Sequence, residues 1–346
     1  MTPEIAYTPE SDEQVTSAPA FTYLMDTSGI TYYSTGANTH PFANTIRTTA
    51  VYFPDPYGNR ISLLTGQAYS KHIVHGYVSE DQVAAIPNRA QNHNNLIFDH
   101  DPVTQEKILG VDTSRVAYMF DPHCALQSVL EGNNYYIDVV RRRVDTIVTL
   151  MLNAGIPYED LGLYGSLQVG LVPQDPSELR RFNDVDLVVT GTEHYDKVVQ
   201  LAATYHDGAN DWKKTAVRFQ HNLAARKRRQ QLSKLHLYDG EGEFFSDVKV
   251  VPAPGQIPSV TDLGVLQDGV NILFEYTVIE AYESLGYPAI WTVANADGHQ
   301  LQIYSRMYDN IGAAGVGDMI TAVGRMNHRG DLLVLTDNEH HHIYPT

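Results

Sequence analysis

Residues 183–189 read Asn-Asp-Val-Asp-Leu-Val-Val, so two aspartates open an otherwise apolar run. Side chains at positions i and i+2 of a strand point to the same face. A strand here would therefore project Asp184 and Asp186 together, while the valines and the leucine face a core. Two carboxylates held this close repel each other unless a cation lies between them, and Mg²⁺ prefers carboxylate and phosphate oxygens. This stretch predicts one strand of a metal site in an α/β or α+β domain.

Two further segments extend this pattern. Residues 163–170 read Leu-Tyr-Gly-Ser-Leu-Gln-Val-Gly, and residues 244–250 read Phe-Phe-Ser-Asp-Val-Lys-Val. Gly165 lets a phosphate approach the backbone, the amides after it are expected to open a helix whose N-terminus favours anions, and the Ser166 hydroxyl can donate to the same phosphate. Asp247 supplies a third carboxylate from a second strand. Three carboxylates can hold two Mg²⁺ ions about 3.5–4 Å apart, the spacing of two-metal nucleotidyl transfer.

Each segment alone has a simpler explanation. Most Gly-Ser pairs are only turns, and an Asp-x-Asp at the start of a strand is more often a solvated edge or a structural ion site. An aspartate in an apolar strand, such as Asp247, can be a hydrogen-bonded core residue. The order and spacing of all three segments favour a nucleotide and metal site over these alternatives.

Position by position, the three segments resemble the signature of the nucleotidyltransferase superfamily typified by DNA polymerase β. The resemblance covers residues 161–251 and implies a mixed-sheet core. It also implies metal-binding roles for Asp184, Asp186 and Asp247, with Asp247 in addition activating the acceptor hydroxyl. The implied cofactor is Mg²⁺, with Mn²⁺ as a substitute.

The resemblance departs from the family pattern in one loop. The 13 residues between Gly170 and Asp184, which include Arg180 and Arg181, form a longer connection than is usual in the family. The geometry of this loop is therefore not implied by the resemblance, whereas the three aspartates are.

The activity implied is transfer of a nucleoside monophosphate from an NTP or dNTP to an acceptor, with release of pyrophosphate. The acceptor is a nucleic acid or a small molecule. One alternative is nucleotidylation of a protein partner, as in toxin–antitoxin transferases. Another is a module that binds a nucleotide or nucleic acid without turnover.

The charge distribution suggests where phosphate binds. The chain has 24 basic and 41 acidic residues, a net charge of −17, which disfavours indiscriminate binding to nucleic acid or anionic membrane. Residues 272–346 hold three basic and nine acidic residues, a formal charge of −6, whereas residues 213–234 hold eight Lys or Arg. A basic helix in that stretch is the expected phosphate track rather than a merely solvated face, and the expected nucleotide-binding residues are Gly165, Ser166, Arg226, Arg228, Arg229 and Lys249.

Lys249 has a simpler alternative role. It shares a strand face with Asp247 two residues earlier, so a salt bridge between the two side chains is the structural explanation, and neutralising the site or contacting phosphate is the functional one.

In an α+β fold, we expect five segments along the chain. They are a disordered tail at 1–20, a strand-rich N-terminal module at 21–130, the catalytic domain at 131–258, a linker at 259–271 and a small C-terminal β barrel or sandwich at 272–346.

Several elements can be predicted individually. A helical period over about 136–151 predicts a helix that ends at Gly155, with Arg141, Arg142 and Arg143 mostly outside its buried face. Further helices are expected over about 193–205 and from Arg218 to Lys234. A hairpin should pair residues 318–324 with 331–336.

The remaining composition indicates the compartment. Cys124 is the single cysteine, which excludes an internal disulfide framework, and no apolar run approaches the 18 residues of a membrane span. The N-terminus lacks the features of a secretory signal. We therefore expect a cytoplasmic protein with no membrane partner.

Overall fold

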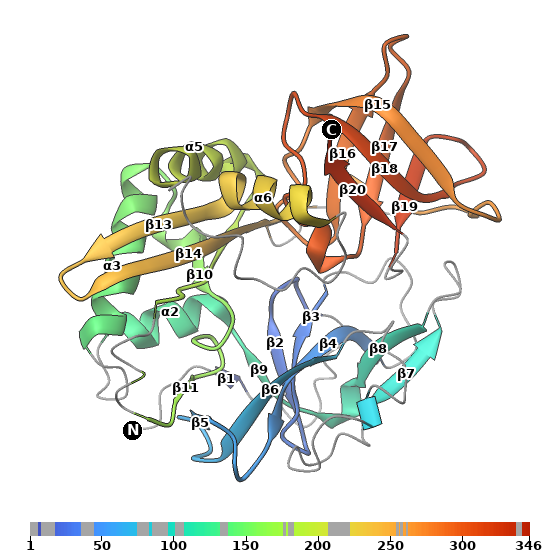
Figure 1. The fold of residues 1–346 in the computed structure, drawn as a ribbon. Coiled ribbons are helices and arrows are strands. Elements are labelled where there is room, and N and C mark those ends of the chain that lie inside the picture. The colour runs from blue at the N-terminus through green and yellow to red at the C-terminus, as the bar shows by residue number, and fades with distance from the viewer. Residues whose placement is uncertain are drawn as a thin grey trace. The chain divides into compact units, whose positions relative to one another are not determined.

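The computed structural model describes most of the chain and divides it into two compact units (Figure 1). The first unit holds residues 1–101, 107–188 and 237–246, and the second holds 102–106, 189–236 and 247–346. The described residues are 6–7, 18–35, 45–74, 83–84, 96–100, 107–131, 138–175, 178, 183–206, 222–253, 256, 259–260, 262–336 and 341–346. The mixed α and β character expected from the sequence is confirmed. The expected domain boundaries stay predictions, and the expected catalytic domain has residues in both units.

A ten-stranded sheet dominates the first unit, as expected for a strand-rich module. Its main path runs β1-β9-β2-β3-β4-β6-β5-β11, and the β7–β8 hairpin joins it through β8 and β4. The strands are β1 (Ala6–Tyr7), β2 (Tyr23–Asp26), β3 (Thr31–Ser34), β4 (Thr45–Pro54), β5 (Arg60–Ser62), β6 (Ala68–Val74), β7 (Ile97–His100), β8 (Lys107–Asp112), β9 (Val116–Phe120) and β11 (Leu171–Pro173).

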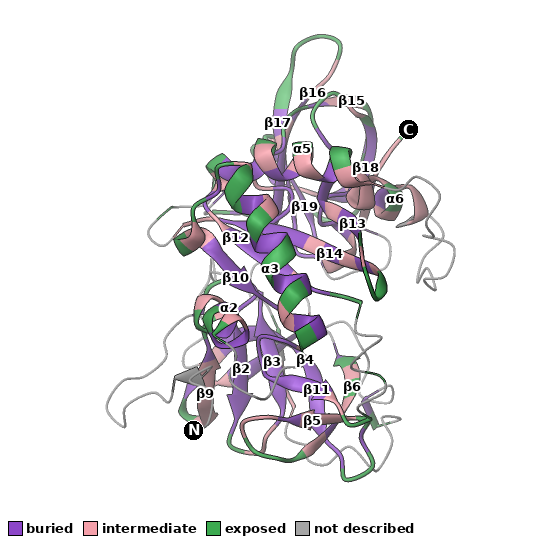
Figure 2. Cartoon of the chain, turned by 90° about the vertical axis from the view of Figure 1, so that its left-hand side faces the viewer, coloured by how far each residue is buried: buried purple, intermediate pink, exposed green. Residues whose placement is uncertain are grey.

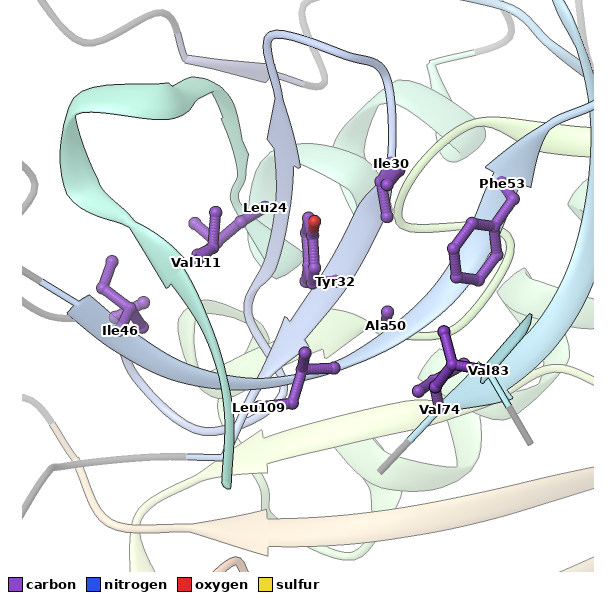
Figure 3. Packing of buried hydrophobic residues seen from close by; sticks show 11 residues of the cluster. Leu24, Ile30, Tyr32, Ile46, Ala50, Phe53, Val74, Val83, Leu109 and Val111 are labelled. Carbon is purple, nitrogen blue, oxygen red and sulfur yellow. The ribbon is translucent and has the colours of Figure 1, made fainter. Parts of the chain in front are cut away.

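Strand β4 lies at the centre of this sheet. It pairs in turn with β8, β3 and β6, and nine of its ten residues are buried. Figure 3 shows Ala50 and Phe53 of β4 within a cluster of side chains from neighbouring strands. Ile46 of the same strand and apolar side chains of other strands, such as Leu24 and Val111, fill the core around them.

The prediction that residues 1–20 are disordered is wrong for part of this segment. Ala6–Tyr7 pair with Met119 and Phe120 of β9, and Ala18 and Ala20 are buried. An edge strand leaves unpaired backbone groups, and a short extended segment satisfies some of them. The acidic composition of the tail concealed this pairing.

The predicted 136–151 helix is α3 (Asp138–Asn153), preceded by α2 (Pro122–Leu130). The expected apolar face of α3 is buried and its other side is exposed, as the stripes of Figure 2 show. The helix ends at Asn153, and Gly155, two residues later, has a φ of +76°, the left-handed conformation common after a helix C-terminus. Placing Arg143 outside the buried face was wrong. Its side chain is 2% exposed, its Nε donates to Asp239 at 2.8 Å, and its guanidinium lies 5.1 Å from the Phe244 ring centroid.

A four-stranded sheet carries the segments of the predicted site. Its order is β10-β12-β14-β13, formed by β10 (Leu161–Leu163), β12 (Leu187–Thr190), β14 (Gly242–Val251) and β13 (Lys234–Asp239). A tight turn at Gly240 and Glu241 joins β13 to β14.

The described residues of the second unit include two α-helices and a closed β barrel. The helices are α5 (Tyr195–Tyr205) and α6 (Asn222–Ser233). The barrel order is β15-β16-β17-β19-β18, closed by pairing of β18 with β15, and β20 adds to β18 outside the ring. The strands are β15 (Asn271–Glu280), β16 (Ala289–Ala294), β17 (Gln300–Ser305), β18 (Met319–Met326), β19 (Leu332–Leu335) and β20 (His342–Pro345).

The barrel confirms the hairpin predicted at its end. Strands β18 and β19 pair antiparallel, with Arg325 opposite Val334. The expected linker, in contrast, is packed into this unit, because Val260, Leu263 and Leu266 are buried with Tyr304 in one apolar cluster. In the described part of the chain, no helix is long and apolar enough to cross a membrane.

The buried ion pair of α3 generates a stability prediction. Arg143→Ala should lower the free energy of unfolding by about 3 kcal/mol, because it leaves the Asp239 carboxylate without its partner. The matched change Arg142→Ala, at a side chain 59% exposed, should cost less than about 0.5 kcal/mol. Urea unfolding measures both, and equal losses would contradict the assignment.

The same pair should depend on pH. The hydrogen bond from Arg143 lowers the pKa of Asp239 in the folded state, so its contribution is complete above the pKa of an unfolded aspartate, about 3.9. It is lost as the pH falls through the folded-state pKa. The stability difference between wild type and Arg143→Ala should therefore shrink below about pH 4.

Candidate nucleotide site

The two aspartates at 184 and 186 are placed by a short parallel pairing with β14. Asp184 forms an isolated parallel bridge with Phe245, and the Val185 amide donates to the Phe245 carbonyl at 2.9 Å. Val185 is buried, whereas Asp184 is exposed and Asp186 half-buried. The predicted alternation is therefore confirmed, although the regular strand β12 begins only at Leu187.

The Gly165–Ser166 turn lies against Asp186. The Tyr164 amide donates to the Asp186 carbonyl at 3.1 Å, and Gly165 has a φ of +75°. A Cβ on Gly165 would lie 2.9 Å from the Asp186 carboxylate oxygen Oδ2. Glycine is thus required both by the backbone conformation and by the approach of this carboxylate.

The helix expected after Ser166 is absent from this described segment. Residues 165–170 form a turn closed by Gly170, whose φ is +61°, and the chain enters β11 at Leu171. Because β11 pairs with β5, the connection to Asp184 begins as a strand of the first unit. Arg180 and Arg181, later in that connection, lie outside the described residues. The argument from a helix N-terminus therefore does not apply here.

Tyr52 of β4 joins this site although the sequence gave no sign of it. It is 2% exposed, and its hydroxyl shares a hydrogen bond with the Ser166 side chain. Burial raises the pKa of Tyr52 to about 12. The negative charges of Asp186 and Asp184 add to this rise, and the positive charge of Arg60 opposes it. No local pattern around Tyr52 predicts this contact, since it depends on pairing across the sheet.

Asp247 lies in the second unit within a dense ion network. Its Oδ1 accepts from Ser233 Oγ and Lys249 Nζ, each at 3.0 Å, and its Oδ2 accepts from Lys249 Nζ at 3.0 Å and from Arg229. Arg229 also stacks on Tyr308, 4.6 Å from the ring centroid. A carboxylate has about four acceptor positions, so these donors occupy its hydrogen-bonding capacity.

This network sets the charge of Asp247. Burial alone would raise the pKa of the carboxyl, but the charges of Arg229 and Lys249 outweigh it and hold the pKa below its ordinary value. Lys249 is fully buried and forms the salt bridge that was its structural alternative. Its role in nucleotide binding stays a prediction.

The arginines of α6 contact acidic and aromatic residues of the same unit. Arg226 pairs with Asp309 at 3.2 Å, and Arg228 pairs with Asp318 at 2.6 Å. Gly315 allows α6 to come close, because a Cβ there would lie 3.1 Å from Arg228 Nη2. These ion pairs give the helix a structural role, and its role in binding phosphate stays a prediction. Lys213, Lys214 and Arg218 of the predicted track lie outside the described residues. The arginines of α6 stabilise the acidic part of the unit, whereas Lys227 is exposed.

The residues that could hold a metal are those whose His, Cys, Asp or Glu side chains lie close together. Within the described ranges, no group of three or more His, Cys, Asp or Glu side chains gathers at metal-binding distance. Asp184 and Asp186 are the two carboxylates that would hold Mg²⁺ together with phosphate oxygens. Asp247, in the second unit, already accepts hydrogen bonds from Ser233, Lys249 and Arg229.

Comparison with known proteins adds no relative. No family model matches the chain, and no curated protein or solved structure matches it significantly. The assignment of the site therefore depends on its own residues and geometry.

Gly165 offers a direct test of the turn. Gly165→Ala should weaken binding of MgATP at least tenfold, because the new Cβ displaces the Asp186 carboxylate. Gly66→Ala is the matched control, since Gly66 has a similar φ of +70° but nothing within 4 Å of its Cβ position. Calorimetric titration separates the two, and similar binding by both variants would refute the role of Gly165.

The α6 ion pairs generate a second prediction. Arg228→Glu should destabilise the second unit by about 2 kcal/mol through repulsion of Asp318, and adding Asp318→Arg should restore most of the loss. Lys227→Glu, at the exposed neighbouring position, should change stability little. A double-mutant cycle by urea unfolding without coupling would contradict this arrangement.

Proposed function

We propose that this chain is a Mg²⁺-dependent nucleotidyltransferase that moves a nucleoside monophosphate from an NTP or dNTP to an acceptor. The observation that carries the proposal is the pairing of Asp184 with Phe245 beside the Gly165–Ser166 turn. This pairing supports the position that the resemblance implies for the aspartates. A bound Mg²⁺ would stabilise charge that develops on the transferred phosphate.

The chain's own residues would share the remaining work. The backbone amides of the Gly165–Ser166 turn and the hydroxyl of Ser166 would bind the terminal phosphates of the nucleotide. Asp184, which is exposed, and Asp186, which is held against Gly165, would orient the α-phosphate through the cation. Pyrophosphate leaves as the acceptor oxygen bonds to the α-phosphorus.

Asp247 supports a second candidate function. A carboxylate with a lowered pKa that accepts from Arg229, Ser233 and Lys249 is a weak base for an acceptor hydroxyl. If the network persists when nucleotide binds, the chain is a nucleotide-binding module without turnover. For catalysis, Asp247 would have to exchange a lysine or arginine contact for the acceptor.

The acceptor is less constrained than the donor. The barrel segment 272–346 has a formal charge of −6, so it would repel a polyanionic acceptor. A small molecule or a protein hydroxyl meets no such repulsion. Protein nucleotidylation therefore remains an alternative, distinguished by where the labelled nucleotide appears.

Substitution of the aspartates tests the proposal. Asp184→Asn and Asp186→Asn should each reduce pyrophosphate release by at least about 10³-fold, because each removes charge that holds the cation. Asp145→Asn, an exposed aspartate of α3, is the control and should leave the rate unchanged. Pyrophosphate release is measured with each of the four common NTPs, and mass spectrometry identifies the products.

Three results distinguish the functions. Wild-type rates from the Asp184→Asn/Asp186→Asn double variant would refute the site. Tight nucleotide binding with no pyrophosphate release, with or without added acceptors, would establish the binding module. Label on protein rather than on RNA, DNA or a small molecule would establish protein nucleotidylation.

A further inference from the structure

Backbone pairing connects the strand-rich sheet of the first unit to the Gly165–Ser166 turn. Strand β11 pairs antiparallel with β5, so that Ser62 lies opposite Leu171. The Leu63 amide donates to the Gly170 carbonyl at 2.9 Å, and the Leu171 amide donates back to the Ser166 carbonyl at 2.9 Å. The turn is thus anchored to the sheet by its own backbone.

Tyr52 adds a side-chain connection to the same turn. It enters from β4, the central strand of the sheet, and its buried hydroxyl is hydrogen-bonded to Ser166. The acidic groups acting on this hydroxyl are Asp186 and Asp184. The buried phenol of Tyr52 is therefore hydrogen-bonded to the serine of the candidate site, and the charges of both carboxylates raise its pKa.

Arg60 carries a positive charge that acts on the Tyr52 hydroxyl and opposes the rise in its pKa. It begins β5, opposite Pro173 of β11. Its Nη1 atom is buried and has no hydrogen-bond partner among the described residues. By contrast, Arg228 and Arg229 each donate to a carboxylate.

A buried guanidinium nitrogen without an acceptor is costly, and an anion relieves that cost. Arginine presents a planar fork of donors that matches the oxygens of a phosphate group. An arginine whose strand pairs with β11, directly after the Gly165–Ser166 turn, is suited to a polyphosphate bridged by a cation, because the carboxylates of Asp184 and Asp186 alone would repel it.

We propose that Arg60 is a phosphate-binding residue of the nucleotide site, supplied by the strand-rich sheet, and that Tyr52 is the positioning residue that holds Ser166 beside it. This inference rests on the nucleotide site of the proposed function, and it adds that the N-terminal sheet contributes to the site. The ligand recognised is the triphosphate group, independent of the base.

The test compares ligands with and without phosphates. Calorimetric titration in Mg²⁺ measures binding of ATP, GTP, CTP, UTP, inorganic tripolyphosphate and adenosine to the full chain. Arg60→Gln should weaken binding of every NTP and of tripolyphosphate by one common factor, about 10- to 100-fold, and leave adenosine binding unchanged. Arg60→Lys should recover part of the loss.

Two further variants complete the design. Arg142→Gln makes the same charge change at an exposed position of the first unit and should bind all ligands as wild type does. Tyr52→Phe should weaken phosphate binding less than Arg60→Gln does, and the double variant should show a loss smaller than the product of the single losses. The thermal unfolding midpoint confirms that each variant is folded.

The outcomes separate this inference from the proposed activity. Unchanged tripolyphosphate and NTP binding by folded Arg60→Gln overturns the inference, even if wild type releases pyrophosphate. Arg60-dependent binding without pyrophosphate release supports the inference and refutes turnover. If wild type binds none of the phosphates, both fail.

Discussion

The ion pairs of helix α6 are the interactions on which the second unit most depends. The barrel segment carries a formal charge of −6, and a compact structure of one sign repels itself. Arg226 and Arg228 place positive charge on Asp309 and Asp318, and Arg229 lies between Asp247 and the ring of Tyr308. The basic helix thus offsets part of the negative charge of the barrel segment within one folded unit. The basic helix serves structure first, and any ligand must compete with these contacts.

Local patterns predicted much of the architecture. The helical period located α3, the turn residues located the β18–β19 hairpin, and alternation placed Asp184 and Asp186 on the side away from buried Val185. Each of these follows from neighbours within one element, where the repeat of 3.6 or 2 residues is decisive. Such features are readable because no distant part of the chain is needed to form them.

The features that were missed all depend on distant partners. Arg143 is buried because Asp239 and Phe244, which lie far along the sequence, contact its side chain. Tyr52 contacts Ser166 only once β4 and β5 have joined the sheet. A charged or aromatic side chain has the same local pattern whether it faces water or a partner far along the chain. The turn after Ser166 was misjudged for a related reason, since β11 pairs with β5 and leaves no room for a helix.

The bridge between Asp184 and Phe245 has a consequence for how the protein reaches its native state. The residues of the candidate site come from β4, from the turn before β11 and from the bridge with β14, which are widely separated along the chain. Contacts between residues so far apart in the sequence form slowly, because the chain loses the entropy of closing large loops before the contacts contribute favourable free energy. During synthesis, Asp184 leaves the ribosome before Phe245 does, so the backbone pairing between them cannot form until Phe245 has also emerged. Ligand-binding competence should therefore be among the last properties that the folding chain acquires.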